Sequence, residues 1–248
     1  MVEIKNISKS FDDKEVLKGI TTVFETGKIN CIIGKSGSGK TVLLKIIIGL
    51  EEPNIGNVLY DGREFTGIKT KFKKEIRREI GMVFQGGALF DSLTILENVI
   101  FPLDMFTEMT YAEKVERAHY CLNRVGLKNV DKLYPADLSG GMQKRAAIAR
   151  AIVNSPKYLF CDEPNSGLDP VTAGTIDELI KDIVNEMKVT TIINTHDMNS
   201  VLDIGDKVIF LSKGKKEWEG NPQEILSVKN ADLQEFIKPF MSISKKAK

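Results

Sequence analysis

The sequence predicts an α/β fold with a mainly parallel central sheet. Short strands that are almost entirely apolar alternate along the chain with helical segments, which is typical of parallel strands buried on both faces. One of them, INCIIG at 29–34, runs directly into a glycine-rich loop and then into the helical segment TVLLKIIIGL. With 248 residues, 42% of them hydrophobic, the chain can form one large domain or two closely packed subdomains.

The first 65 residues are predicted to consist of strands and turns. Segments 3–11, 15–25 and 56–65 are rich in Ile, Val, Phe and Tyr, and the turn dipeptides DD, TG and DG lie among them. Further strands are predicted wherever a short apolar run recurs, at 79–84, 158–161, 190–194 and 207–211.

Helices are predicted to dominate between about 86 and 155, where Thr94 and Thr110 each begin the Thr-x-x-Glu pattern of a capping box. Gly126 is expected to end the second of these helices. Asp169-Pro170 and Asn221-Pro222 each place a cap residue before a proline at the first helical position. A hairpin at Lys213-Gly214 and a helical tail follow, and the last residues, SISKKAK, are expected to fray.

Composition excludes several classes of protein. The 35 basic and 34 acidic residues nearly balance, which argues against the polyanion-binding surface of a nucleic-acid-binding protein. The N-terminus lacks the zones of a signal peptide, and no apolar run approaches the roughly 18–20 residues that span a bilayer. Cys31, Cys121 and Cys161 show no metal-binding spacing. We therefore expect a soluble cytosolic protein in which any metal is a hard ion held by oxygen ligands.

GKSGSGKT at 34–41 fits the phosphate-binding pattern G-x-x-x-x-G-K-[ST] and lies in the required context, between a strand and a helix. Its glycines free the backbone amides to wrap phosphates, Lys40 is expected to reach the β- and γ-phosphates, and Thr41 to offer its hydroxyl to Mg²⁺. The alternative is a glycine-rich turn with a chance lysine. The predicted nucleotide-binding residues of this loop are Gly34, Lys35, Ser36, Gly37, Ser38, Gly39, Lys40 and Thr41.

Polar side chains end three of the apolar strands. Asp162 and Glu163 follow YLFC, and we expect Asp162 to hold Mg²⁺ and Glu163 to polarise the attacking water, unless the pair merely caps a helix before Pro164. Gln85 follows EIGMVF and could touch the metal or the water, or simply be solvated. His196 follows TTIIN and could sense the γ-phosphate, or have only a capping or structural role.

LSGG at 138–141 is a second possible phosphate site, because two glycines open a helix there and free N–H groups meet the positive helix end. In this order, the motifs resemble those of the nucleotide-binding subunits of ATP-binding cassette (ABC) transporters, from Phe11 to the tail. By that resemblance, Phe11 stacks on adenine, Val16 packs against the base, Gln85 is the glutamine loop and His196 the switch histidine. The remaining matches are the LSGG signature with Ser139, Gly140 and Gly141, the acidic pair Asp162 and Glu163, and the D-loop Ser166–Asp169, in which Asp169 is expected near the nucleotide.

The resemblance implies the ABC ATPase form of the P-loop NTPase fold, with an antiparallel β-subdomain and a helical subdomain beside the parallel core. We expect a single domain over 1–248, made of a RecA-like core plus β-subdomain at 1–85 and 156–220, a helical subdomain at about 86–155 and a helical tail at 221–248. The cofactors implied are ATP and Mg²⁺. The implied assembly is a head-to-tail homodimer, in which the LSGG segment of one subunit closes over ATP held by the other.

The apolar segment 86–106 follows Gln85, and in ABC subunits this region receives a coupling helix of an integral membrane permease. Met142, in LSGGM…RAAIARA, together with FQGGALFDSLTILENVIFPL and DEPNSGLDPVT, is similar to ATPase subunits of Mla-type, Mce-associated phospholipid transporters. That similarity implies a periplasmic Mce-type lipid-binding partner and a location on the cytoplasmic face of a bacterial inner membrane. The alternatives are an ABC transporter for another cargo, or a soluble ABC protein acting on ribosomes or DNA; we expect no nucleic-acid partner.

Overall fold

The computed structural model of the chain describes residues 1–244. It divides into two units, Met1–Lys73 with Thr190–Lys248, and Lys74–Val189. The expectation that the last residues fray lies partly outside the described residues. Among residues 1–244, none of the helices combines the length and the hydrophobicity that crossing a bilayer requires.

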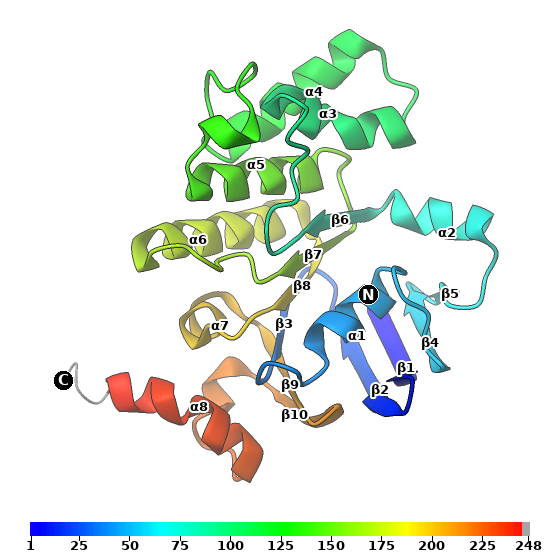
Figure 1. The fold of residues 1–248 in the computed structure, drawn as a ribbon, viewed down its shortest axis with the longest axis vertical. Coiled ribbons are helices and arrows are strands. Elements are labelled where there is room, and N and C mark those ends of the chain that lie inside the picture. The colour runs from blue at the N-terminus through cyan, green and yellow to red at the C-terminus, as the bar shows by residue number, and fades with distance from the viewer. Residues whose placement is uncertain (245–248) are drawn as a thin grey trace. The chain divides into compact units, whose positions relative to one another are not determined.

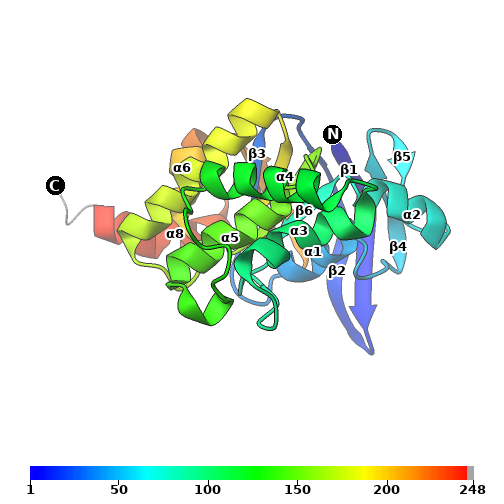
Figure 2. The ribbon, with the colours of Figure 1, turned by 90° about the horizontal axis from the view of Figure 1, so that it is seen from above.

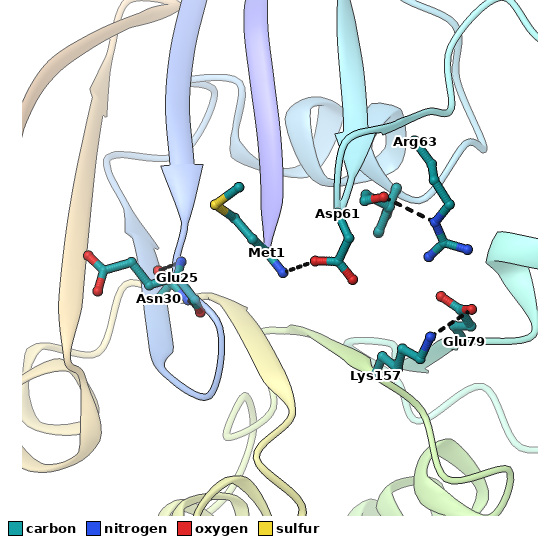
Figure 3. A network of polar contacts seen from close by, with 8 residues as sticks. Met1, Glu25, Asn30, Asp61, Arg63, Glu79 and Lys157 are labelled. Carbon is teal, nitrogen blue, oxygen red and sulfur yellow. Dashed lines mark hydrogen bonds and ion pairs between the residues drawn. The ribbon is translucent and has the colours of Figure 1, made fainter.

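The first unit contains an antiparallel sheet with the order β2-β1-β4-β5. Its strands alternate buried and exposed residues, as expected when one face packs on a core. The Met1 ammonium pairs with Asp61 at 2.5 Å, which ties the start of β1 to the turn after β4 (Figure 3). The strands are β1 (Val2–Phe11), β2 (Lys14–Phe24), β4 (Ile55–Tyr60) and β5 (Arg63–Glu64).

The same unit contains parallel strands, of which β3 and β8 are fully buried. β3 pairs in parallel with both β8 and β9, and β10 returns antiparallel to β9 through a turn at Lys213 and Gly214, which have φ angles of 50° and 80°. The strands are β3 (Ile29–Ile33), β8 (Thr190–Asn194), β9 (Lys207–Ser212) and β10 (Lys215–Gly220). The helical elements of this unit are α1 (Lys40–Ile47), α7 (Met198–Ile204), the 3₁₀ turn η2 (Pro222–Glu224) and α8 (Ala231–Ser244).

The second unit combines a parallel pair of strands with a helical layer. Helix α5 packs against α3, α4 and α6 (Figures 1 and 2). At the start of the strand pair, Lys157 and Glu79 form an ion pair at 3.1 Å (Figure 3). The elements are β6 (Ile80–Val83), β7 (Tyr158–Asp162), α3 (Ile95–Phe106), α4 (Tyr111–Arg124), the 3₁₀ turn η1 (Pro135–Asp137), α5 (Gly140–Ile152) and α6 (Pro170–Met187).

Most predicted helix boundaries are confirmed. Thr94 and Thr110 both form complete capping boxes, Asp169 caps α6, and α4 ends two residues before Gly126, whose φ is 70°. Asn221-Pro222 begins only a short 3₁₀ turn rather than a longer helix. Helix α2 (Thr70–Arg77) was not predicted, because its sequence TKFKKEIR has few apolar residues to reveal a helical period.

The one polar residue in the apolar segment INCIIG is Asn30, and its hydrogen bonds account for its presence there. Asn30 is fully buried, and its amide group donates to the carbonyls of Glu25, Lys28 and Thr191 at 3.1–3.2 Å, while its oxygen accepts the Glu25 N–H at 3.0 Å. The pair Glu25 and Asn30 is drawn in Figure 3. Asn30 therefore closes the turn that leads into β3 and joins β3 to β8.

Replacing Asn30 by Ala should lower the free energy of unfolding by about 2–3 kcal/mol, because buried main-chain groups lose their partners. Chemical denaturation followed by circular dichroism measures this change. Asn123→Ala, at an exposed position of α4, serves as the control and should change the free energy by less than about 0.5 kcal/mol. Equal effects of the two substitutions would contradict the role of Asn30.

Candidate functional site

The glycine-rich loop follows β3, and its backbone requires glycine at two positions. Gly34 has a φ of 153°, and a Cβ atom there would lie 2.3 Å from the carbonyl oxygen of Leu211. Gly39 has a φ of 103°, and its Cβ would lie 2.7 Å from Leu17 Cδ2 and 3.1 Å from the carbonyl oxygen of Val16. The close approach at Gly39 places the loop against β2, next to the predicted base-contacting residue Val16.

Lys40 opens α1 and bends back into this loop. Its ammonium donates to the carbonyls of Gly34 at 2.7 Å and Lys35 at 3.3 Å, and the residue is 9% exposed. The buried hydroxyl oxygen of Ser38 has no hydrogen-bond partner within the described part of the chain. Thr41, in the first turn of α1, is exposed together with Lys35 and Ser36. A loop that combines a charged amine, hydroxyl groups and a helix N-terminus is suited to bind phosphate.

The pairing of strands brings His196 to the same end of the sheet as this loop. Strands β3 and β8 pair in parallel with Ile32 opposite Asn194, so Gly34 and His196 each follow the carboxyl end of neighbouring strands. His196 is exposed, whereas Asp197 accepts a hydrogen bond from the Asn199 N–H at 2.9 Å and caps α7. The capping role at the start of α7 therefore belongs to Asp197 and not to His196.

Phe11 is the predicted adenine-stacking residue. It ends β1 opposite Lys14, is 41% exposed, and has the Lys9 ammonium 4.8 Å from its ring centroid. An exposed aromatic ring is able to stack on a base.

In the second unit, β6 and β7 bring Gln85 and the two acidic residues to the same edge. The strands are parallel, with Val83 opposite Cys161, and each strand ends within two residues of that pair. Glu163 has a φ of 50°, an uncommon conformation for a non-glycine residue that is often found at functional sites. Asp162 and Glu163 do not cap a helix, because the next helix, α6, begins later and is capped by Asp169.

Lys144 was not predicted to belong to the site, but the structure places it there. It lies on α5, is 7% exposed, and its ammonium donates a hydrogen bond to the main-chain carbonyl of Gln85. Burial lowers the pKa of Lys144, while Cys161, Glu163 and Asp162 act in the opposite direction and raise it. The sequence carried little signal for this, because Lys144 and Arg145 stand side by side before the stretch AAIARAI and nothing local shows which of the two is buried.

The signature segment, Leu138–Gly141, forms the N-terminus of α5. Ser139 caps the helix by accepting the Met142 N–H at 3.3 Å, and α-helical geometry leaves the amides of Gly140 and Gly141 without an acceptor in the helix. A Cβ atom at Gly141 would lie 2.7 Å from Thr172 Cγ2, so glycine is required there by close packing against α6.

A hollow of about 470 Å³ opens between the starts of α5 and α6. Ser139, Gly140, Gly141 and Met142 line it from one side and Asp169 from the other. The Asp169 carboxylate accepts the Thr172 hydroxyl at 2.5 Å and main-chain N–H groups at 3.0 and 3.1 Å. The hydrogen bonds from Thr172 lower the pKa of Asp169 below its ordinary value.

The predicted site residues thus form one group in the first unit and two groups in the second. The first unit holds the nucleotide-binding loop with Val16 and Phe11 on the hairpin before it and His196 after the neighbouring strand. The second unit holds Gln85 beside Asp162 and Glu163, and separately the signature segment beside Asp169.

A family model described as "ABC transporter" matches residues 17–166. The chain is 35% identical over 238 residues to the intermembrane phospholipid transport system ATP-binding protein MlaF of Haemophilus influenzae, covering 96% of this chain and 90% of the relative. It is 38% identical over 243 residues to the arginine transport ATP-binding protein ArtM of Bacillus subtilis, covering 97% of this chain and 100% of the relative.

A solved dimeric structure of the ABC transporter cassette MJ0796 has a TM-score of 0.83 and 35% identity, and the match covers 90% of this chain and 99% of that chain. A second structure of the same cassette, in a post-hydrolysis state bound to ADP and Pi, has a TM-score of 0.82. The match in sequence and fold, together with a glycine-rich phosphate loop on β3 and an acidic pair after β7, shows that this chain belongs to the ABC transporter family as an ATP-hydrolysing, ATP-binding subunit.

Proposed function

We propose that this chain is the motor subunit of a phospholipid transporter and that a second copy completes each of its ATP sites. Lys40 and the amides of the nucleotide-binding loop bind the β- and γ-phosphates, Glu163 polarises the attacking water, and His196 contacts the γ-phosphate. Phe11 and Val16 hold the adenine. The observation that carries this proposal is the conformation of the loop after β3, with Lys40 turned back into it and the Ser38 hydroxyl buried without a partner among residues 1–244.

Mg²⁺ fits the donor atoms that the chain offers. Thr41, Gln85 and Asp162 supply hydroxyl, amide and carboxylate oxygens, which are hard ligands suited to this ion. Among the described residues, no three His, Cys, Asp or Glu side chains are grouped as a metal site. This agrees with the usual binding of Mg²⁺ by a few protein oxygens together with substrate phosphates and water. When bound, the ion would neutralise charge that develops on the transferred phosphoryl group.

The signature segment supports the homodimer. Its exposed helix N-terminus can bind an anion, and the hollow beside it is open. The relative MJ0796 is dimeric in its solved structure. We infer a head-to-tail dimer, in which Ser139, Gly140 and Gly141 of one copy contact the γ-phosphate of ATP bound to the other, with Asp169 at the same interface.

The apolar segment 86–106 supports a membrane permease as the partner. Phe90 and Met105 are 41% and 54% exposed, which makes this region suited to receive an apolar partner segment. Likeness to MlaF and the residue Met142 favour phospholipid as the cargo, with a periplasmic Mce-type protein attached through the permease. In this proposal the protein is located on the cytoplasmic face of a bacterial inner membrane. ArtM is similar to the same degree, and its name favours the second candidate, a transporter for another cargo.

Two substitutions should separate binding from hydrolysis. Lys40→Ala should abolish both ATP binding and turnover, because the site loses the positive charge that binds the phosphates. Glu163→Gln should bind ATP but hydrolyse it at least about 100-fold more slowly, and the protein should accumulate as an ATP-bound dimer. Phosphate release and size-exclusion chromatography with and without ATP measure these effects; turnover by Glu163→Gln at the wild-type rate would show that Glu163 is not the base.

The cargo is tested by isolating this chain from detergent-solubilised membranes and identifying its partners and their bound lipid. We expect a polytopic permease, an Mce-type protein and co-purifying phospholipid. Met105→Glu should reduce recovery of the permease, whereas Lys128→Glu, exposed in the loop after α4, should not. A permease accompanied by an amino-acid-binding protein would favour the other cargo, and ribosomal or nucleic-acid partners would contradict the transporter.

A further inference from the structure

Helix α5 carries two buried cations in addition to the signature segment at its N-terminus. Lys144 and Arg150 are only 7% and 8% exposed. Burying a charged group is costly unless hydrogen bonds replace its hydration, so the partners of these two side chains indicate what the helix stabilises.

Both cations hold the chain segment that follows β6. Lys144 donates to the Gln85 carbonyl, and the Arg150 guanidinium donates to the carbonyls of Gly87 and Ala88, each at 2.7 Å. The guanidinium carbon also lies 5.9 Å from the centroid of the Phe90 ring. Residues 85–88 are therefore fixed to the side of α5 through main-chain carbonyls, in contacts that do not depend on the side chain of Gln85.

Lys144 differs from Arg150 in its electrostatic surroundings: burial lowers the pKa of both side chains, but for Lys144 the groups Cys161, Glu163 and Asp162 at the end of β7 act in the opposite direction. The same helix position thus connects the main chain of Gln85 with the acidic pair. Ser139 and Lys144 are five residues apart on one helix, a rise of about 7 Å, so a displacement of the signature segment is transmitted directly to Lys144.

We propose that Lys144 is a positioning residue for ATP hydrolysis, which holds Gln85 in place beside the acidic pair and makes it move with the signature segment. This inference rests on the proposed roles of Gln85 and Glu163. Lys144 contacts neither nucleotide nor water in this scheme and acts through Gln85.

The test compares Lys144→Met, which keeps the length of the side chain but removes its donor, with Lys144→Arg, which keeps a cationic donor. Lys144→Met should lower kcat on the order of 10- to 100-fold, with the KM for ATP within about threefold of wild type because the nucleotide-binding loop is intact. Lys144→Arg should keep kcat within about fivefold of the wild-type value. Lys114→Met is the control, because Lys114 is a half-buried lysine of the same unit that pairs with Asp104 at 2.8 Å instead of Gln85; the kcat of this variant should be unchanged.

A double-mutant cycle shows whether Lys144 acts through Gln85. In a Gln85→Ala background, Lys144→Met should lower kcat by less than about threefold further, since the side chain that it positions is gone. Multiplicative effects in the double variant would overturn the proposal. So would wild-type kcat in Lys144→Met, or a loss of thermal stability with kcat unchanged. If Lys144→Met does not fold, Lys144→Gln takes its place in the cycle with the same criteria.

Glu163→Gln measured in parallel separates the two levels of the proposal. Wild-type turnover by Glu163→Gln would remove the proposed catalytic base and with it the reason for positioning Gln85. Loss of turnover in Glu163→Gln together with normal kcat in Lys144→Met would overturn the role of Lys144 alone.

Discussion

Parallel pairing of short buried strands is the constraint on which the candidate site depends. Because parallel strands bring their carboxyl ends to one edge, the pair β3 and β8 delivers the nucleotide-binding loop and His196 together. The pair β6 and β7 delivers Gln85 and the acidic pair in the same way. A shift of one residue in either register would turn side chains to the opposite face and bury the polar groups that must meet a ligand. Asn30, buried in β3, donates to the Thr191 carbonyl of β8 and so reinforces the first of these registers.

The second unit adds a constraint of its own at α5. Gly141 allows this helix to approach α6 so closely that a Cβ atom would overlap Thr172, and Lys144 and Arg150 attach the chain after β6 to its side. The signature segment, the Gln85 loop and the start of α6 are therefore packed around one helix. If ATP is hydrolysed between two copies, as proposed above, such a helix would transmit closure on the partner's nucleotide to the residues proposed to position water and metal.

The sequence alone was sufficient for most of the strands and for the capped helices, because each carries a local signal, and it also predicts the motif residues. Apolar runs identify β3 and β7, Thr-x-x-Glu identifies the starts of α3 and α4, and glycine spacing identifies the phosphate loop. Helix α2 was missed because it is polar, and Asn221-Pro222 starts only a 3₁₀ turn because a cap motif does not determine how far a helix continues. The contacts of Lys144 were not predictable, since they join residues 59 positions apart that only the fold brings together.

A mixture of two inactive variants tests most directly whether each ATP site needs a second copy of the chain. Lys40→Ala removes the phosphate-binding charge, and Ser139→Arg blocks the signature segment, so each variant alone should be inactive. In an equal mixture about half of the dimers are mixed, and each of these has one intact composite site, so ATPase activity should return to at most about a quarter of the wild-type rate. A mixture that stays inactive, or a Ser139→Arg variant that is active alone, would contradict the composite site.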